Sequence, residues 1–122
     1  MVREFIRQFH KVGPLTISEV QYDDYNLSLM GAGWSLNTTS SWRILSNDGL
    51  FGNHDGETKE IIKFLIGETI ASINEFGEAD LDFTLSFGNG NKLQVFSNSY
   101  FEPWIFNFDG QITLVAGYPS CQ

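Results

Sequence analysis

Apolar residues near the start of the chain follow the spacing of one helix face. They stand at the i, i+3, i+4 and i+7 positions of residues 2–10: Val2, Phe5, Ile6 and Phe9. Charged residues fall on the other side, and Gly13-Pro14 follows the segment. The pattern predicts an amphipathic helix over 2–10 that ends before Gly13. A short first strand is the alternative interpretation, because the segment is brief.

A second apolar segment predicts another helix over residues 57–66. Its apolar residues lie among glutamates and lysines: Ile61, Ile62, Phe64, Leu65 and Ile66. Glu57, near the start, suits the positive end of a helix dipole. Gly67 is a suitable C-terminal cap, because glycine readily adopts the left-handed conformation that ends many helices.

Strand signals fill much of the first half. Residues 15–20 alternate imperfectly between apolar and polar and predict a strand. Two apolar stretches, 27–29 and 34–36, flank a glycine-containing turn and predict a hairpin. Residues 42–45 predict a further strand, and the polar residues 46–56 predict a loop.

The second half carries the clearest strand pattern. Residues 81–87 and 92–96 alternate on either side of Asn89-Gly90, and this combination is the strongest short-range signal of a hairpin. Alternation over 104–108 and 112–116 around Asp109-Gly110 predicts a second hairpin.

The two halves resemble each other. Gly31, Gly33 and Leu36 match Gly88, Gly90 and Leu93 at one constant offset, and Trp42 falls near the position of Trp104. We therefore expect one domain, 1–122, with an internal pseudo-repeat of 1–56 and 57–116, each half an α-β-β-β unit. The expected fold class is α+β and mostly β, an antiparallel sandwich or half-barrel with helices near 2–10 and 57–66.

Composition narrows the kind of partner. The chain has 122 residues with 7 basic and 15 acidic ones, a net charge of -8. A duplex-binding surface needs a basic excess, so we expect no nucleic acid and, for the same reason, no anionic membrane as partner. A cationic partner is favoured instead. The unpaired Cys121 and the charged first residues, which do not form a signal peptide, predict a cytoplasmic protein.

The residue types that carry chemistry are sparse. His10 and His54 are the two histidines, and they lack the spacing of a metal site. Cys121 lies near the chain end, where no rigid partner would orient it as a nucleophile. We expect no metal, no cofactor and no enzymatic activity. A hydrolase with paired carboxylates is the catalytic alternative, since an acidic chain offers many such pairs.

The segment 100–104 combines an acid with aromatic rings next to a predicted strand. Such a combination can anchor a basic partner, although tryptophans on strands, such as Trp104, more often belong to the core. Arg43, between apolar neighbours, either pairs with an acid such as Glu102 or faces solvent.

Motifs over nearly the whole chain are similar to those of a known domain type: Leu27-Ser28-Leu29, Gly33, Leu36, Trp42-Arg43-Ile44, Asp80-Leu81, Leu85-Ser86-Phe87-Gly88-Asn89-Gly90, Leu93-Gln94-Val95-Phe96, Tyr100, Glu102 and Trp104. The pattern is a Trp-Arg strand, a Leu-x-Phe-x-Asn-Gly hairpin and a Tyr/Glu/Trp strand. It resembles small bacterial domains grouped with the cytosolic immunity proteins of polymorphic and contact-dependent toxin systems. In this chain Phe101 separates Tyr100 from Glu102, where a tighter acid–aromatic pair is expected.

The resemblance implies a cytosolic immunity protein without catalytic residues. Such a protein would neutralise a cognate toxin C-terminal domain, a basic one of the nuclease type, by blocking its active-site or substrate groove. The expected contacts are acids for charge and aromatic side chains as anchors: Asp23, Asp24, Asp48, Asp55 and Glu102, with Tyr100 and Trp104. The alternative is a small-molecule-binding module with its ligand inside a β-barrel or between two sheets. The sequence does not predict the oligomeric state.

Overall fold

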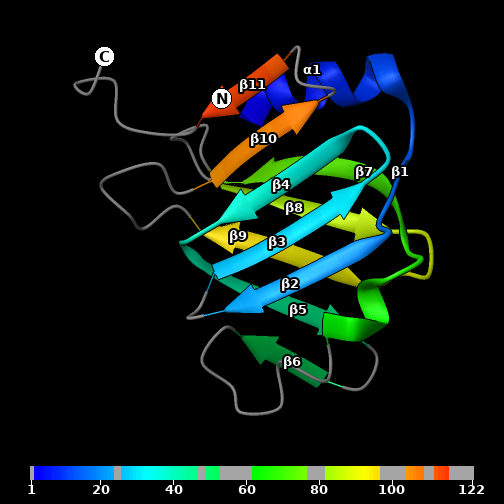
Figure 1. Cartoon of the computed structure of the whole chain (residues 1–122). Helices are drawn as coiled ribbons and strands as arrows, with labels where there is room; N and C mark the ends of the chain where they lie inside the picture. Colours follow the sequence, from blue (N-terminus) through cyan, green and yellow to red (C-terminus); the bar gives the residue numbers. More distant parts are fainter. Residues whose placement is uncertain are drawn as a thin grey trace.

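The computed structural model describes residues 2–23, 26–46, 49–52, 62–76, 82–96, 104–108 and 112–115. In these residues the chain forms two antiparallel sheets and an N-terminal helix (Figure 1). In chain order the elements are α1 (Val2–Val12), β1 (Leu15–Thr16), β2 (Glu19–Asp23), β3 (Asn26–Gly31), β4 (Trp34–Thr38), β5 (Ser41–Ser46), β6 (Gly49–Gly52), the 3-10 helix η1 (Ile62–Leu65), β7 (Thr69–Phe76), β8 (Asp82–Phe87), β9 (Lys92–Phe96), β10 (Trp104–Phe108) and β11 (Ile112–Val115).

The two sheets interleave the two halves of the chain. Sheet A has the strand order β1-β7-β8-β9-β5-β6, and sheet B has the order β11-β10-β4-β3-β2. Each sheet contains a three-stranded meander from one half, β7-β8-β9 or β2-β3-β4. A hairpin from the other half, β5-β6 or β10-β11, extends it, and β1 adds a further edge strand to sheet A. This arrangement is the mostly β, antiparallel sandwich that the sequence predicts, and the sheets do not close into a barrel.

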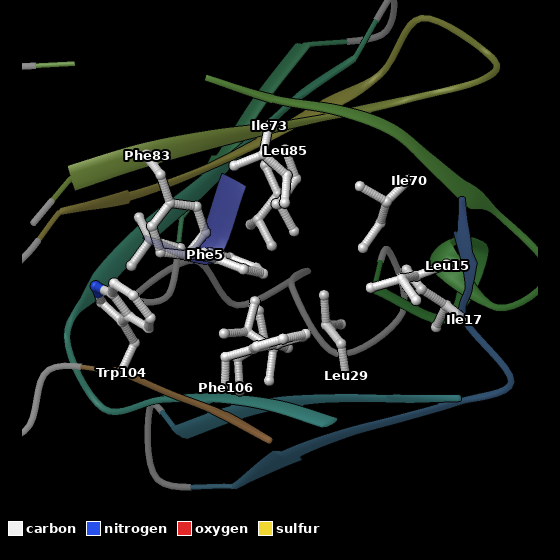
Figure 2. Close-up of a cluster of buried hydrophobic side chains, with 14 of the residues drawn as sticks. Phe5, Leu15, Ile17, Leu29, Ile70, Ile73, Phe83, Leu85, Trp104 and Phe106 are labelled. Atoms are coloured by element: carbon white, nitrogen blue, oxygen red, sulfur yellow. The ribbon is translucent and has the colours of Figure 1, made fainter. Parts of the chain in front are cut away.

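The core lies between the sheets, where alternate side chains of both meet. Figure 2 shows the labelled part of this cluster: Phe5, Leu15, Ile17, Leu29, Ile70, Ile73, Phe83, Leu85, Trp104 and Phe106. Each of these side chains is buried. Burial of an aliphatic or aromatic side chain contributes about 1.5–3 kcal/mol, so this shared layer holds the two sheets together.

Helix α1 packs along one open edge of the sandwich. Its Phe5 lies between the sheets, with ring centroids 5.4 Å from Phe83 of sheet A and 4.4 Å from Phe106 of sheet B. The helix runs two residues further than the predicted 2–10, and Gly13 ends it with a φ of 81°. The helical interpretation of this segment is therefore confirmed, and the alternative of a first strand is wrong.

One predicted strand and one predicted loop differ from the structure. The strand expected over 15–20 is divided at Ile17 and Ser18, so that β1 joins sheet A and β2 joins sheet B. The loop expected over 46–56 contains β6, which pairs with β5. The predicted hairpins β3-β4, β8-β9 and β10-β11 are confirmed.

The helix predicted over 57–66 is wrong in its described part. Residues 62–65 form a 3-10 helix, and residues 57–61 lie outside the described part. A 3-10 helix has three residues per turn. Ile62 and Leu65 therefore share one side and are buried there, and Gly67 then takes a φ of 91°.

Candidate functional site

Two of the expected partner-binding residues lie in the described part. Asp23 is exposed at the end of β2. Trp104 is 0% exposed, and its ring lies 5.2 Å from that of Phe83 and 5.6 Å from that of Phe5. The expectation that Trp104 anchors a partner is therefore wrong, because its indole belongs to the core. The other expected residues lie outside the described part: Asp24, Asp48, Asp55, Tyr100 and Glu102.

The net charge comes from residues outside the described part of the chain. Six of the 15 acidic residues are in the described part: Glu4, Glu19, Asp23, Glu68, Glu75 and Asp82. Six of the 7 basic residues are there too: Arg3, Arg7, Lys11, Arg43, Lys63 and Lys92. The described framework is thus neutral, and the remaining nine acids and one lysine account for the whole charge of -8.

Two large apolar side chains in and just after η1 are exposed on the surface. Phe64 is 77% exposed and Ile66 is 50% exposed, whereas Ile62 and Leu65 are buried in the core. Single exposed apolar residues are common on protein surfaces. Here a phenylalanine and an isoleucine that are each at least half exposed stand two positions apart, so together they offer more apolar surface than a single residue. We call Phe64 and Ile66 the apolar pair.

Backbone hydrogen bonds fix this segment to the sandwich. The amide of Gly67 donates to the carbonyl of Ile17 at 2.7 Å, and the amide of Ile17 donates to the carbonyl of Glu68 at 2.9 Å. The exposed side chains are therefore carried on an ordered backbone, so a partner would not have to order that backbone when it binds.

A shallow groove lies next to this segment on sheet B. Its volume is about 530 Å³, and its lining comes from the start of β2, the β3-β4 hairpin and β10: Ser18, Glu19, Met30, Gly31, Gly33, Trp34, Ser35 and Asn107. Ser18 directly follows Ile17, to which Gly67 is bonded. The hydroxyl of Ser18 donates to the carbonyl of Met30 at 3.2 Å. The groove thus begins one residue after Ile17, to which the backbone of Gly67 is bonded, and Glu19 is one of the residues that line it.

The described residues do not form a metal site or a membrane-spanning helix. There, no group of three or more His, Cys, Asp or Glu side chains is placed to hold a metal ion. No helix in the same part of the chain is long and apolar enough to cross a membrane. Comparisons of the chain with family models, curated proteins and solved structures gave no match.

The sequence does contain a sign of the apolar pair, although the helical periodicity does not reveal it. Five of the six residues 61–66 are apolar, which is more than one face of a helix can bury. Some of these side chains had to face away from the core. The pattern could not say which ones, because that depends on the three-residue period of η1.

Proposed function

We propose that the chain is a cytosolic immunity protein that binds a basic toxin domain through a surface centred on Phe64 and Ile66. The proposal combines the family resemblance with the exposed apolar pair, which is the observation that carries it. Interface energy is concentrated in a few apolar or aromatic anchors surrounded by polar groups. An exposed Phe on an ordered backbone, beside a groove that contains a carboxylate, has these properties.

The charge of the chain supports a cationic partner. A net charge of -8 attracts a basic protein over a long range and raises the rate of encounter. The segment that directly precedes η1 in sequence, residues 53–61, contributes three acids and one lysine to that charge. Toxins that cut nucleic acid have cationic grooves that bind phosphates. The carboxylates of a bound inhibitor would lie in the same groove and interact with the same cations.

Binding then accounts for inhibition without chemistry. The apolar pair would enter a depression on the toxin domain, and the acids would lie over its cationic groove. A specific interface buries about 800 Å² on each partner. An area of that size extends well beyond two side chains, so the groove on sheet B would belong to the same surface.

Co-expression tests the proposal directly. The chain is expressed together with the toxin domain encoded next to it, and growth and complex formation are measured. We expect growth to be rescued and the two chains to co-purify. The double variant Phe64→Ser/Ile66→Ser should bind at least about 30-fold more weakly, because the loss of even one interface anchor costs about 2 kcal/mol or more.

The control is Asn74→Ser, a neutral change at an exposed residue of β7. It should leave rescue and binding unchanged. All variants should keep the unfolding midpoint of the wild type, because exposed substitutions seldom change stability by more than about 0.5 kcal/mol. Absence of any complex with the wild type would reject the function, and full binding by the double variant would reject the surface.

A further inference from the structure

Arg43 lies on the outer face of sheet A, at the end of a row of polar residues. Its neighbours in β5, Trp42 and Ile44, are buried in the core, so the side chain of Arg43 points outward. Gln94 of β9 lies directly opposite Arg43, and Thr84 of β8 lies opposite Gln94. Residues paired in this way face the same side of a sheet.

Neutral groups hold the guanidinium of Arg43 in place. Its Nε donates to Oε1 of Gln94 at 2.6 Å, and Nε2 of Gln94 donates to Oγ1 of Thr84 at 3.5 Å. The guanidinium carbon lies 5.0 Å from the centre of the Phe96 ring, in a cation–π contact. One edge and one face of the guanidinium are thus engaged, and its two terminal nitrogens form no hydrogen bond with the described residues.

The charge of this arginine is not neutralised within the described part of the chain. No carboxylate oxygen there forms an ion pair with Arg43, and Glu102, the partner considered from the sequence, lies outside that part. Acids outnumber bases by more than two to one in this chain. A neutral amide orients the guanidinium without neutralising its charge, which suits the recognition of an external anion.

A second cation lies on the same face. Lys92 is two residues before Gln94 on β9, so it points to the same side, and it is exposed. It lies opposite Leu45 and is therefore a diagonal neighbour of Arg43. The acid described on this face, Asp82, is two residues before Thr84 on β8, and β9 lies between β8 and β5.

We propose that Arg43 and Lys92 form a binding site for a phosphate-type dianion on the outer face of sheet A. The two terminal nitrogens of Arg43 would donate in parallel to two phosphate oxygens, and the ammonium of Lys92 would balance the second charge. A ligand with a single carboxylate has one negative charge, which Arg43 alone would balance. This site is separate from the apolar pair. If the protein does not bind phosphate, the proposed function is therefore unaffected.

Titration with inorganic phosphate tests the site in the whole chain. The side-chain Nε–H signal of Arg43 and the amide signals of β9 are followed by NMR at constant ionic strength in chloride. We expect saturable shifts in the wild type. Arg43→Gln should weaken binding about tenfold or more, because a charge-assisted contact is lost, and Lys92→Gln should weaken it about threefold. Lys11→Gln, at an exposed position of α1, should bind like the wild type.

Two further variants separate a built site from general charge. Gln94→Leu keeps both cations but releases the guanidinium, and should weaken binding about threefold. Arg43→Lys keeps the charge but loses the paired donors, and should also bind more weakly. Unchanged amide spectra away from sheet A show that each variant is folded. Equal phosphate affinity in Arg43→Gln and the wild type would overturn the proposal.

Probes with other anions define the ligand class. Phenyl phosphate that binds more tightly than inorganic phosphate would support the site and indicate a phosphate monoester as its source. Equal affinity would support the site and indicate free phosphate. Acetate that binds as tightly as either would overturn the assignment to a dianion, because a monovalent carboxylate would then suffice.

Discussion

Single glycines and aromatic residues decide how closely the elements approach one another. The indole Nε1 of Trp34 donates to the carbonyl of Thr16 at 3.3 Å, directly over Gly31. A Cβ atom at Gly31 would lie 2.0 Å from that nitrogen and 2.3 Å from that carbonyl oxygen. The bond between β1 and the β3-β4 hairpin therefore depends on the missing side chain of Gly31.

Gly31→Ala should destabilise the fold by about 3 kcal/mol, because it overpacks this contact and breaks the Trp34 hydrogen bond. Urea unfolding followed by tryptophan fluorescence measures the change. The matched control is Gly88→Ala, where an added Cβ meets nothing within 4 Å. That variant should stay within about 0.5 kcal/mol of the wild type. A loss of stability at Gly88 as large as that at Gly31 would show that glycine flexibility, and not close packing, sets the effect.

Among the elements, α1 and the hairpin β8-β9 could be predicted from the sequence pattern. The spacing of Val2, Phe5 and Phe9 predicts α1 correctly, because one helix face suffices to bury all three. The hairpin β8-β9 was predictable from its alternation around Asn89-Gly90, and Gly90 indeed has a φ of 93°.

Other elements depend on distant contacts that local periodicity cannot show. β6 is short and rich in glycine, and it is a strand because β5 pairs with it. η1 ends at Leu65, and two residues later the amide of Gly67 bonds to the carbonyl of Ile17, far away in sequence. The same limit applies to the site, since the exposure of Phe64 follows from the local geometry of η1. The internal repeat stays a prediction, although the interleaved meanders and hairpins are consistent with it.

Phe5→Ala should cost about 3–5 kcal/mol, since the ring contacts Phe83, Trp104 and Phe106 and its loss leaves a cavity between the sheets. Thermal or urea unfolding measures the loss. Arg7→Ala, at an exposed position of the same helix, is the control and should have an effect below about 0.5 kcal/mol. Equal effects of the two changes would contradict the placement of Phe5 between the sheets.

At the scale of the whole molecule, structure and charge are divided between different parts of the chain. The described residues are electrically balanced, and the net charge of -8 comes from the rest of the chain. Stability should therefore depend little on salt, because no net charge is built into the framework. Binding to a cationic partner should depend on it strongly.

Unfolding in urea at low and high concentrations of sodium chloride checks the first half of this statement. We expect the free energy of unfolding to change by less than about 1 kcal/mol, because the described ion pairs, Arg3–Glu75 and Arg7–Glu4, are exposed and such pairs contribute little. A much larger gain in stability with salt would indicate that repulsion among the acids strains the folded state.

The affinity of the chain for its proposed partner, a basic toxin domain, measured by calorimetry at several salt concentrations, tests the central claim most directly. The account predicts a one-to-one complex whose affinity falls about tenfold or more between low and high salt. It also predicts that Phe64→Ser/Ile66→Ser weakens the complex at every salt concentration, because the apolar contact is not screened. No complex at low salt, or an affinity that neither salt nor the double variant changes, would contradict it.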